Sequence, residues 1–150
     1  MNIPEGEDGV THINIYSKGK TFLGRWLTNF AHTEFEYKAI KFASLEAFWY
    51  WSLCNDPSLC KLYGHQAKIA GKEILKQKGI PQYFINEELI KEAIDIKLKT
   101  YPEKMRELAE STLKFTHYYE YGDKRVEAGY EWVTEHFELR RKQLKEYYNI

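Results

Sequence analysis

A segment rich in aromatic residues, 42–51 (Phe-Ala-Ser-Leu-Glu-Ala-Phe-Trp-Tyr-Trp), constrains the fold more than any other part of the chain. It is too aromatic for a solvent-facing surface, so we expect it to be buried. One carboxylate, Glu46, lies near its start. A carboxylate held against aromatic rings loses hydration, which disfavours its charged form and raises its pKa. Glu46 is therefore either a satisfied structural acid or an acid/base group available for chemistry.

Length and charge limit the class of function. A chain of 150 residues suits one domain that buries roughly 70% of its unfolded surface. Lys and Arg number 22, as do Asp and Glu, so no net field steers the protein toward nucleic acid or an anionic membrane. We expect no strong non-specific binding of nucleic acid. The 12 Tyr, 8 Phe and 4 Trp exceed the needs of a small core and leave rings to line a pocket for a planar ligand.

The cysteines and the N-terminus indicate a reducing compartment. Cys54 and Cys60 lack the clustered partners of a zinc site and the bridging framework of a small secreted domain. The chain has no apolar run near the roughly 18 residues of a membrane span, and its first residues are no signal peptide. We expect a cytoplasmic protein with reduced thiols and neither metal nor cofactor.

The residue pattern predicts a predominantly helical α+β domain with a few short strands. Residues 1–10 are expected to be a flexible lead-in to a domain over residues 11–150. Ile13 and Ile15 are expected on one face of the first strand, because the residues around them alternate. The predicted non-helical elements are a strand over 11–16, a turn over 17–20, a loop or short helix over 21–30, a strand or hairpin over 34–42, and an extended segment over 115–121 before a turn at Gly122-Asp123.

Helix signals dominate the remainder. Ser44 can cap a helix over 45–53, with Glu46 in the first turn, where the helix dipole favours negative charge. The other predicted helices run from Asp56-Pro57 to Gly64, from about 66 to 78, from Asn86-Glu87-Glu88 onward, and from about 130 to 148. Pro102 either breaks the helix that starts at Asn86 or begins a further one.

The last predicted helix has two faces. Val133, Phe137 and Leu144 are expected to pack inward. The charged residues between them are expected to form a solvated, ion-paired face. They are Glu135, Glu138, Arg140, Arg141 and Lys145.

Generic catalytic motifs are absent: the chain has no Walker loop, GxGxxG, HExxH or Gly-x-Ser-x-Gly. Its five histidines lack metal-ligand spacing. His117 differs from the other four because it sits within the aromatic segment 115–119.

Three segments, taken in their order along the chain, resemble the NADAR family, the YbiA-like domain associated with NAD and ADP-ribose. They are residues 15–18 (Ile-Tyr-Ser-Lys), 27–31 (Leu-Thr-Asn-Phe-Ala) and 42–46 (Phe-Ala-Ser-Leu-Glu). That family has a Ser/Thr-Asn-Phe motif followed by Phe-x-Ser-x-Glu and an aromatic helix. Residues 67–71 resemble its Ala-Lys-x-x-Gly element, and Glu131-Trp132 its late Trp. Gly24-Arg25 and the segment 116–119 (Thr-His-Tyr-Tyr) look closest to bacteriophage-encoded members.

The chain departs from the family pattern at two positions of the aromatic helix. The family continues Glu-His-x-x-Gln-Ala-x-Lys, whereas Ala47 and Leu53 stand here in place of the histidine and the lysine. The family's late Trp-Gly element is also not recognisable. A mechanism that needs either side chain does not transfer to this chain.

The resemblance implies the YbiA/NADAR fold and cleavage of a ribose C1′–N bond in an ADP-ribose-type substrate, for instance removal of ADP-ribose from modified guanine. It implies catalytic roles for Glu46 and Lys68. Lys68 would contact a phosphate or attack an opened ribose, or is simply solvated. The residues implied for ligand binding are Arg25, Thr28, Asn29, Phe30, Trp49, His117, Tyr118 and Trp132.

These assignments have structural alternatives. In these alternatives Glu46 complements the helix dipole and has no other role, and Asn29 forms a turn and has no other role. Trp49 could be core instead of a stacking platform. For the chain as a whole, the resemblance implies an N-glycosidase or ADP-ribosyl hydrolase, which in a phage would serve counter-defence. The alternatives are a non-catalytic module that sequesters an NAD-derived nucleotide and an interaction domain that keeps only the scaffold.

Overall fold

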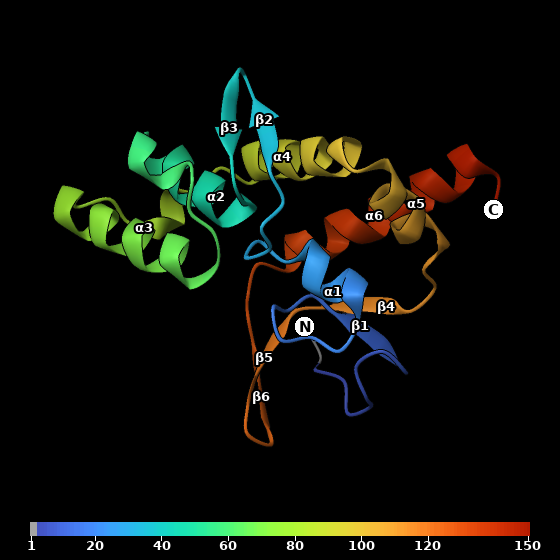
Figure 1. Cartoon of the computed structure of the whole chain (residues 1–150). Coiled ribbons are helices and arrows are strands. Elements are labelled where there is room, and N and C mark those ends of the chain that lie inside the picture. Colours follow the sequence, from blue (N-terminus) through green and yellow to red (C-terminus); the bar gives the residue numbers. More distant parts are fainter. Residues whose placement is uncertain (1–2) are drawn as a thin grey trace. The chain divides into compact units, whose positions relative to one another are not determined.

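The computed structural model describes residues 3–150 (Figure 1). The chain divides into two compact units. The first unit combines both ends of the chain, Met1–Thr28 and Tyr101–Ile150, and the second is the intervening Asn29–Thr100. Long helices and short paired strands occur together. The α+β class predicted from the sequence is therefore confirmed.

The first unit has at its centre a parallel strand pair closed by residues from opposite ends of the chain. Strand β1 pairs with β4, with Ile13 opposite Phe115. Strands β5 and β6 form an antiparallel ribbon, and α5 packs along α6. The elements of this unit are β1 (His12–Asn14), α1 (Phe22–Leu27), α5 (Pro102–Glu110), β4 (Lys114–Thr116), β5 (Tyr118–Tyr121), β6 (Lys124–Glu127) and α6 (Glu131–Tyr148).

Strand β1 is buried on both faces, not on one. Ile13 and Ile15 are buried as predicted, but His12 and Asn14, which alternate with them, are buried as well. Alternation predicts a solvated polar face only when the polar side chains lack partners inside the protein. Here both polar side chains are hydrogen-bonded within the unit.

The segment preceding β1 also differs from the expected flexible lead-in. Residues 1–2 lie outside the described residues. The Arg125 guanidinium donates to the carbonyl oxygens of Pro4 (2.6 Å) and Gly6 (2.8 Å). Asp8 is only 7% exposed and accepts two backbone hydrogen bonds. The prediction of a loose lead-in is therefore wrong for residues 4–8.

Helix α6 confirms part of its predicted pattern. Val133 and Phe137 are buried as expected. Arg141 was expected on a solvated face, but it is buried and donates to the Leu113 carbonyl oxygen at 2.6 Å. It also pairs with Glu138. A long cationic side chain can be buried when backbone and carboxylate acceptors satisfy its donors, which charge patterning along one helix does not reveal.

The second unit places a β-hairpin against helices. Figure 1 shows β2 and β3 beside α2 and α4, in agreement with the contacts between these elements. Lys38 and Ala39 at the hairpin turn have φ values of 48° and 67°, as a two-residue hairpin loop of the primed type requires. The elements are β2 (Phe35–Tyr37), β3 (Ile40–Phe42), α2 (Leu45–Cys54), η1 (Pro57–Leu59), α3 (Gly64–Lys78), η2 (Gln82–Phe84) and α4 (Glu87–Thr100).

Helix α2 is the core helix of this unit. The Ala47 N–H donates to Ser44 Oγ at 3.1 Å, so the predicted cap is confirmed. Every residue from Leu45 to Tyr50 is buried. A helix that is apolar all round must be covered on all sides. The hairpin, α3 and α4 provide that cover.

One predicted helix is much shorter than expected. Asp56 caps the segment as predicted, but only the single 3₁₀ turn η1 follows. Gly64 begins α3 and does not end the preceding helix; its φ of +59° lies outside the right-handed helical region, so the chain changes direction there. Helix α3 ends at Gly79, as the sequence predicts.

Cys54 and Cys60 are free thiols, both half-buried. Burial raises the pKa of the Cys60 thiol. Among residues 3–150, no helix is both long and apolar enough to cross a membrane.

Candidate functional site

Glu46 is the second residue of α2, in the second unit. Its backbone N–H donates to the Asn29 carbonyl oxygen at 2.9 Å, which joins the predicted Asn-Phe motif to the helix start. Its side chain is 9% exposed. Two segments that lie 17 positions apart in the sequence therefore meet at one buried carboxyl group.

The environment of Glu46 disfavours its charge. Burial raises the pKa of its carboxyl to about 7, and the Lys68 and Lys72 ammonium groups partly oppose that rise. No group among residues 3–150 donates a hydrogen bond to the carboxyl. A carboxyl group with this pKa is present in both protonation states at neutral pH, as a general acid or base requires.

Close packing of α3 on α2 explains why the two lysines act on Glu46. A Cβ on Gly71 would collide with the Tyr50 ring, so only glycine permits this approach. Ala67, one turn earlier, is fully buried. Lys68 and Lys72 flank these contact positions on the same helix.

Phe30 lies beside Lys68. The Lys68 ammonium nitrogen is 5.9 Å from the Phe30 ring centroid, within reach of a cation–π contact. The Asn29 side-chain amide has no hydrogen-bond partner among the described residues, which leaves its donor and its acceptor available. The structure therefore brings four predicted site residues together in the second unit: Asn29, Phe30, Glu46 and Lys68.

Trp49 is core. Its side chain is only 5% exposed, one helical turn after Glu46. A nucleobase cannot stack on a ring covered by protein on both faces. The prediction that Trp49 binds ligand is therefore wrong, and its structural alternative holds.

Three of the predicted ligand-binding residues in the first unit show no ligand-directed feature. Arg25 donates to the Gly19 carbonyl oxygen at 2.6 Å and lies over the Phe22 ring. Thr28 is buried at the end of α1. Trp132 is half-buried, with its ring edge-on to that of Tyr130. Their roles toward a ligand remain predictions.

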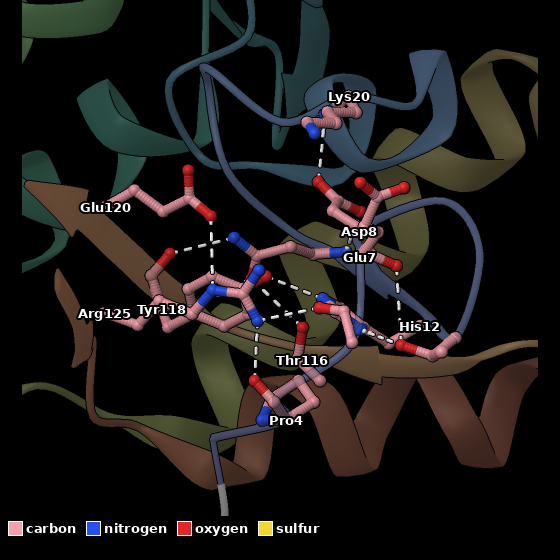
Figure 2. A network of polar contacts seen from close by, with 12 residues as sticks. Pro4, Glu7, Asp8, His12, Lys20, Thr116, Tyr118, Glu120 and Arg125 are labelled. Atoms are coloured by element: carbon pink, nitrogen blue, oxygen red, sulfur yellow. Dashed lines mark hydrogen bonds and ion pairs between the residues drawn. The ribbon is translucent and has the colours of Figure 1, made fainter. Parts of the chain in front are cut away.

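Tyr118 belongs to a polar network that Figure 2 shows in detail. It is fully buried, and its hydroxyl is 2.6 Å from His12 Nε2. The Arg125 guanidinium lies 5.0 Å from its ring centroid and pairs with Glu120. Tyr118 is therefore no stacking platform. The partly exposed Tyr119 beside it packs with Tyr16, but the sequence alone did not distinguish the two tyrosines.

Asn14 was not singled out from the sequence, yet it organises this network. Its amide nitrogen donates to the Tyr118 carbonyl oxygen, and its amide oxygen accepts from the Tyr118 N–H and the Thr116 hydroxyl. The side chain thus acts as a backbone partner for β5. The partners lie more than 100 positions away, so no local pattern could identify this role.

His117 Nδ1 has almost no solvent-accessible area and no hydrogen-bond partner, and it is the one side-chain nitrogen or oxygen atom of residues 3–150 with both properties. Burial lowers the pKa of its imidazole to about 4, so the ring is neutral at pH 7. Its ring meets Tyr119 edge-on at 6.0 Å. Its predicted contact with a ligand remains a prediction.

No group of three or more His, Cys, Asp or Glu side chains suited to a metal ion occurs in the part of the chain that the structure describes. Comparison with family models, with curated proteins and with solved structures finds no match for this chain.

Proposed function

We propose that the protein is an N-glycosidase that hydrolyses the C1′–N bond of an ADP-ribose-type substrate, such as ADP-ribosylated guanine. The observation that supports this most is the Glu46 carboxyl: buried, without a hydrogen-bond partner among residues 3–150, and with a pKa raised to about 7. The resemblance to the NADAR family supplies the substrate class.

The chemistry suits a carboxylate beside lysines. Cleavage of the C1′–N bond builds positive charge on the ribose, which a nearby carboxylate stabilises. In its ionised form Glu46 takes a proton from the water that attacks C1′, while the bonding electron pair leaves with the base nitrogen. Lys68 and Lys72 favour the ionised form of Glu46, and Lys68 is also a candidate partner for the substrate diphosphate.

The test is release of ADP-ribose from ADP-ribosylated guanosine by purified protein, followed by chromatography. Glu46→Gln should lower kcat by at least about a hundredfold, the scale on which one acid/base group contributes. Glu36→Gln, which changes an exposed carboxylate in the same unit, is the matched control. Equal turnover by Glu46→Gln and wild type would exclude Glu46 as the catalytic group.

A second candidate is sequestration of an NAD-derived nucleotide without cleavage. Ala47 and Leu53 favour it, because the family pattern has a histidine and a lysine at these positions, and the fully buried Ala47 offers no polar group to replace the histidine. Calorimetry with ADP-ribose and NAD, paired with an overnight product assay, separates the two. Binding without product would decide for sequestration.

The biological setting that we propose is reversal of host defence by a bacteriophage. Co-expression with a guanine-specific ADP-ribosylating toxin should restore growth of the host, and Glu46→Gln should not. Failure of the wild-type protein to rescue growth would count against counter-defence.

A further inference from the structure

Two ring pairs join the segment after Asn29 to the start of α3, next to the candidate site. Phe30 meets His65 edge-on, with ring centroids 5.0 Å apart. His32 and Tyr63 are stacked, with centroids 4.2 Å apart and planes within 2° of parallel. The Gly64 N–H donates to the Phe30 carbonyl oxygen at 3.1 Å between the two pairs.

These rings do not belong to the core. Tyr63 is 45% exposed, His32 and His65 are exposed, and Phe30 is half-buried. Burial of apolar area therefore explains little of their arrangement. The stacked pair is built from residues 31 positions apart, so the fold orients both rings before any ligand arrives.

Positive charge adjoins the rings. Lys68 follows His65 by three residues on α3, so both lie on one side of the helix, and its ammonium nitrogen is 5.9 Å from the Phe30 centroid. Lys72 continues that side by one turn. Neither Lys68 nor Lys72 forms an ion pair among residues 3–150, whereas Lys91 on α4 is paired with Glu87.

We propose that His32, Tyr63, Phe30 and His65 form a stacking surface for a nucleobase whose attached phosphates lie over Lys68 and Lys72. A nucleobase stacks with its π-face on aromatic rings, and the lysine ammonium group binds phosphate as a compact positive charge. The ligand is thus a nucleotide. In ADP-ribose the adenine would stack on the rings, and the diphosphate attached to the adenosine would lie over the two lysines. This inference deepens the proposed function and rests on it for the identity of the ligand.

The inference assigns determinants of binding, not of bond cleavage. Loss of a stacking ring should weaken nucleotide binding and leave the chemical step unchanged, because Glu46 is untouched. Tyr63→Ala and His32→Ala should each raise the Kd for ADP-ribose, and the KM of the reaction, by about tenfold, with kcat unchanged. Tyr63→Phe keeps the ring and should retain wild-type affinity.

The experiment is a calorimetric titration of these variants with three probes: ADP-ribose, ribose 5-phosphate and guanosine. Tyr83→Ala is the matched control, since Tyr83 is an exposed aromatic residue of the same unit that packs only with its sequence neighbour Phe84 among the ring pairs observed. We expect Tyr63→Ala to weaken ADP-ribose binding and to leave the affinity for ribose 5-phosphate, which has no base, unchanged.

The outcomes separate this inference from the proposed function. ADP-ribose binding that depends on Tyr63 and His32 in a protein without hydrolase activity would uphold the stacking surface and reject catalysis. Hydrolysis with unchanged ADP-ribose affinity in both alanine variants would reject the stacking surface alone. Tight binding of guanosine that requires Tyr63, with no effect on ADP-ribose, would also overturn the assignment to the adenine end.

Discussion

Two buried carboxylates show how differently this chain treats similar groups. Asp8 in the first unit and Glu46 in the second are 7% and 9% exposed. Asp8 accepts from the backbone N–H groups of Asn14 and Lys20, both at 2.9 Å. Glu46 has no hydrogen-bond partner among residues 3–150, and its pKa is raised to about 7.

The difference indicates which of the two groups is structural. A buried carboxylate that receives backbone donors holds a loop in place and contributes stability. A buried carboxyl without donors contributes none in its charged form, which suits the acid/base role that we propose for Glu46. Asp8 therefore has an architectural role in the first unit, whereas Glu46 in the second unit is the group that we propose for chemistry.

The largest expected effect is on the architectural carboxylate. Asp8→Ala leaves two N–H groups without their charged acceptor and should lower the free energy of unfolding by roughly 3–5 kcal/mol. Urea denaturation measures this. Asp123→Ala, at an exposed turn position of the same unit, should change stability by less than about 0.5 kcal/mol. If Asp8→Ala lowered the free energy of unfolding by as little as Asp123→Ala, Asp8 would have no structural role and the contrast with Glu46 would be lost.

Glu46→Gln should act in the opposite direction. Because the folded-state pKa of about 7 exceeds the ordinary 4.5, the contribution of Glu46 to stability is most favourable below pH 4.5 and is lost as the pH rises through 7. Glutamine does not titrate, so the variant should gain up to ~3 kcal/mol on wild type between pH 4.5 and 8. Thermal unfolding over this range measures the gain; a constant difference would contradict a raised pKa.

A smaller loss is expected at the His12–Tyr118 hydrogen bond. Tyr118→Phe removes the hydroxyl that is 2.6 Å from His12 Nε2 and should destabilise the protein by ~1–2 kcal/mol, because a buried ring nitrogen loses its partner. ADP-ribose binding should not change, since Tyr118 is fully buried. If Tyr118→Phe weakened ADP-ribose binding without lowering the free energy of unfolding, Tyr118 would belong to the ligand-binding residues after all.

The smallest expected effect is on the dependence of kcat on pH. Lys68→Met removes the ammonium group that most lowers the pKa of Glu46, so the rising midpoint of kcat against pH should move upward. Lys76→Met, on the same helix, is the control because its ammonium does not contribute to the Glu46 pKa. A midpoint that stays in place or moves downward in Lys68→Met would show that Lys68 does not act on Glu46.

Local signals in the sequence predicted much of the fold correctly. The Ser44 cap, the hairpin over 34–42 and the end of α3 at Gly79 each depend on a few neighbouring residues. The errors at Arg141 and Tyr118 concern side chains whose partners are distant in the sequence. Buried Arg141 and Tyr118 are satisfied by groups that only the folded chain brings near them.

The sequence also anticipated which residues lie close together at the candidate site, whose role is still a prediction. The sequence identified Glu46 from its aromatic surroundings and Lys68 from the family pattern, and the structure places them on packed helices. It could not show that Trp49 is covered, or that His32 and Tyr63 stack, because both facts depend on tertiary packing.

The most direct test of the central claim is the titration of the Glu46 side-chain carboxyl by carbon-detected NMR, with the resonance assigned from its absence in Glu46→Gln. Our account predicts a midpoint near pH 7, because the buried group lacks donors. A midpoint at or below the ordinary 4.5 would mean that hydrogen bonds or charges satisfy Glu46 as they satisfy Asp8, and would contradict its role as the acid/base group.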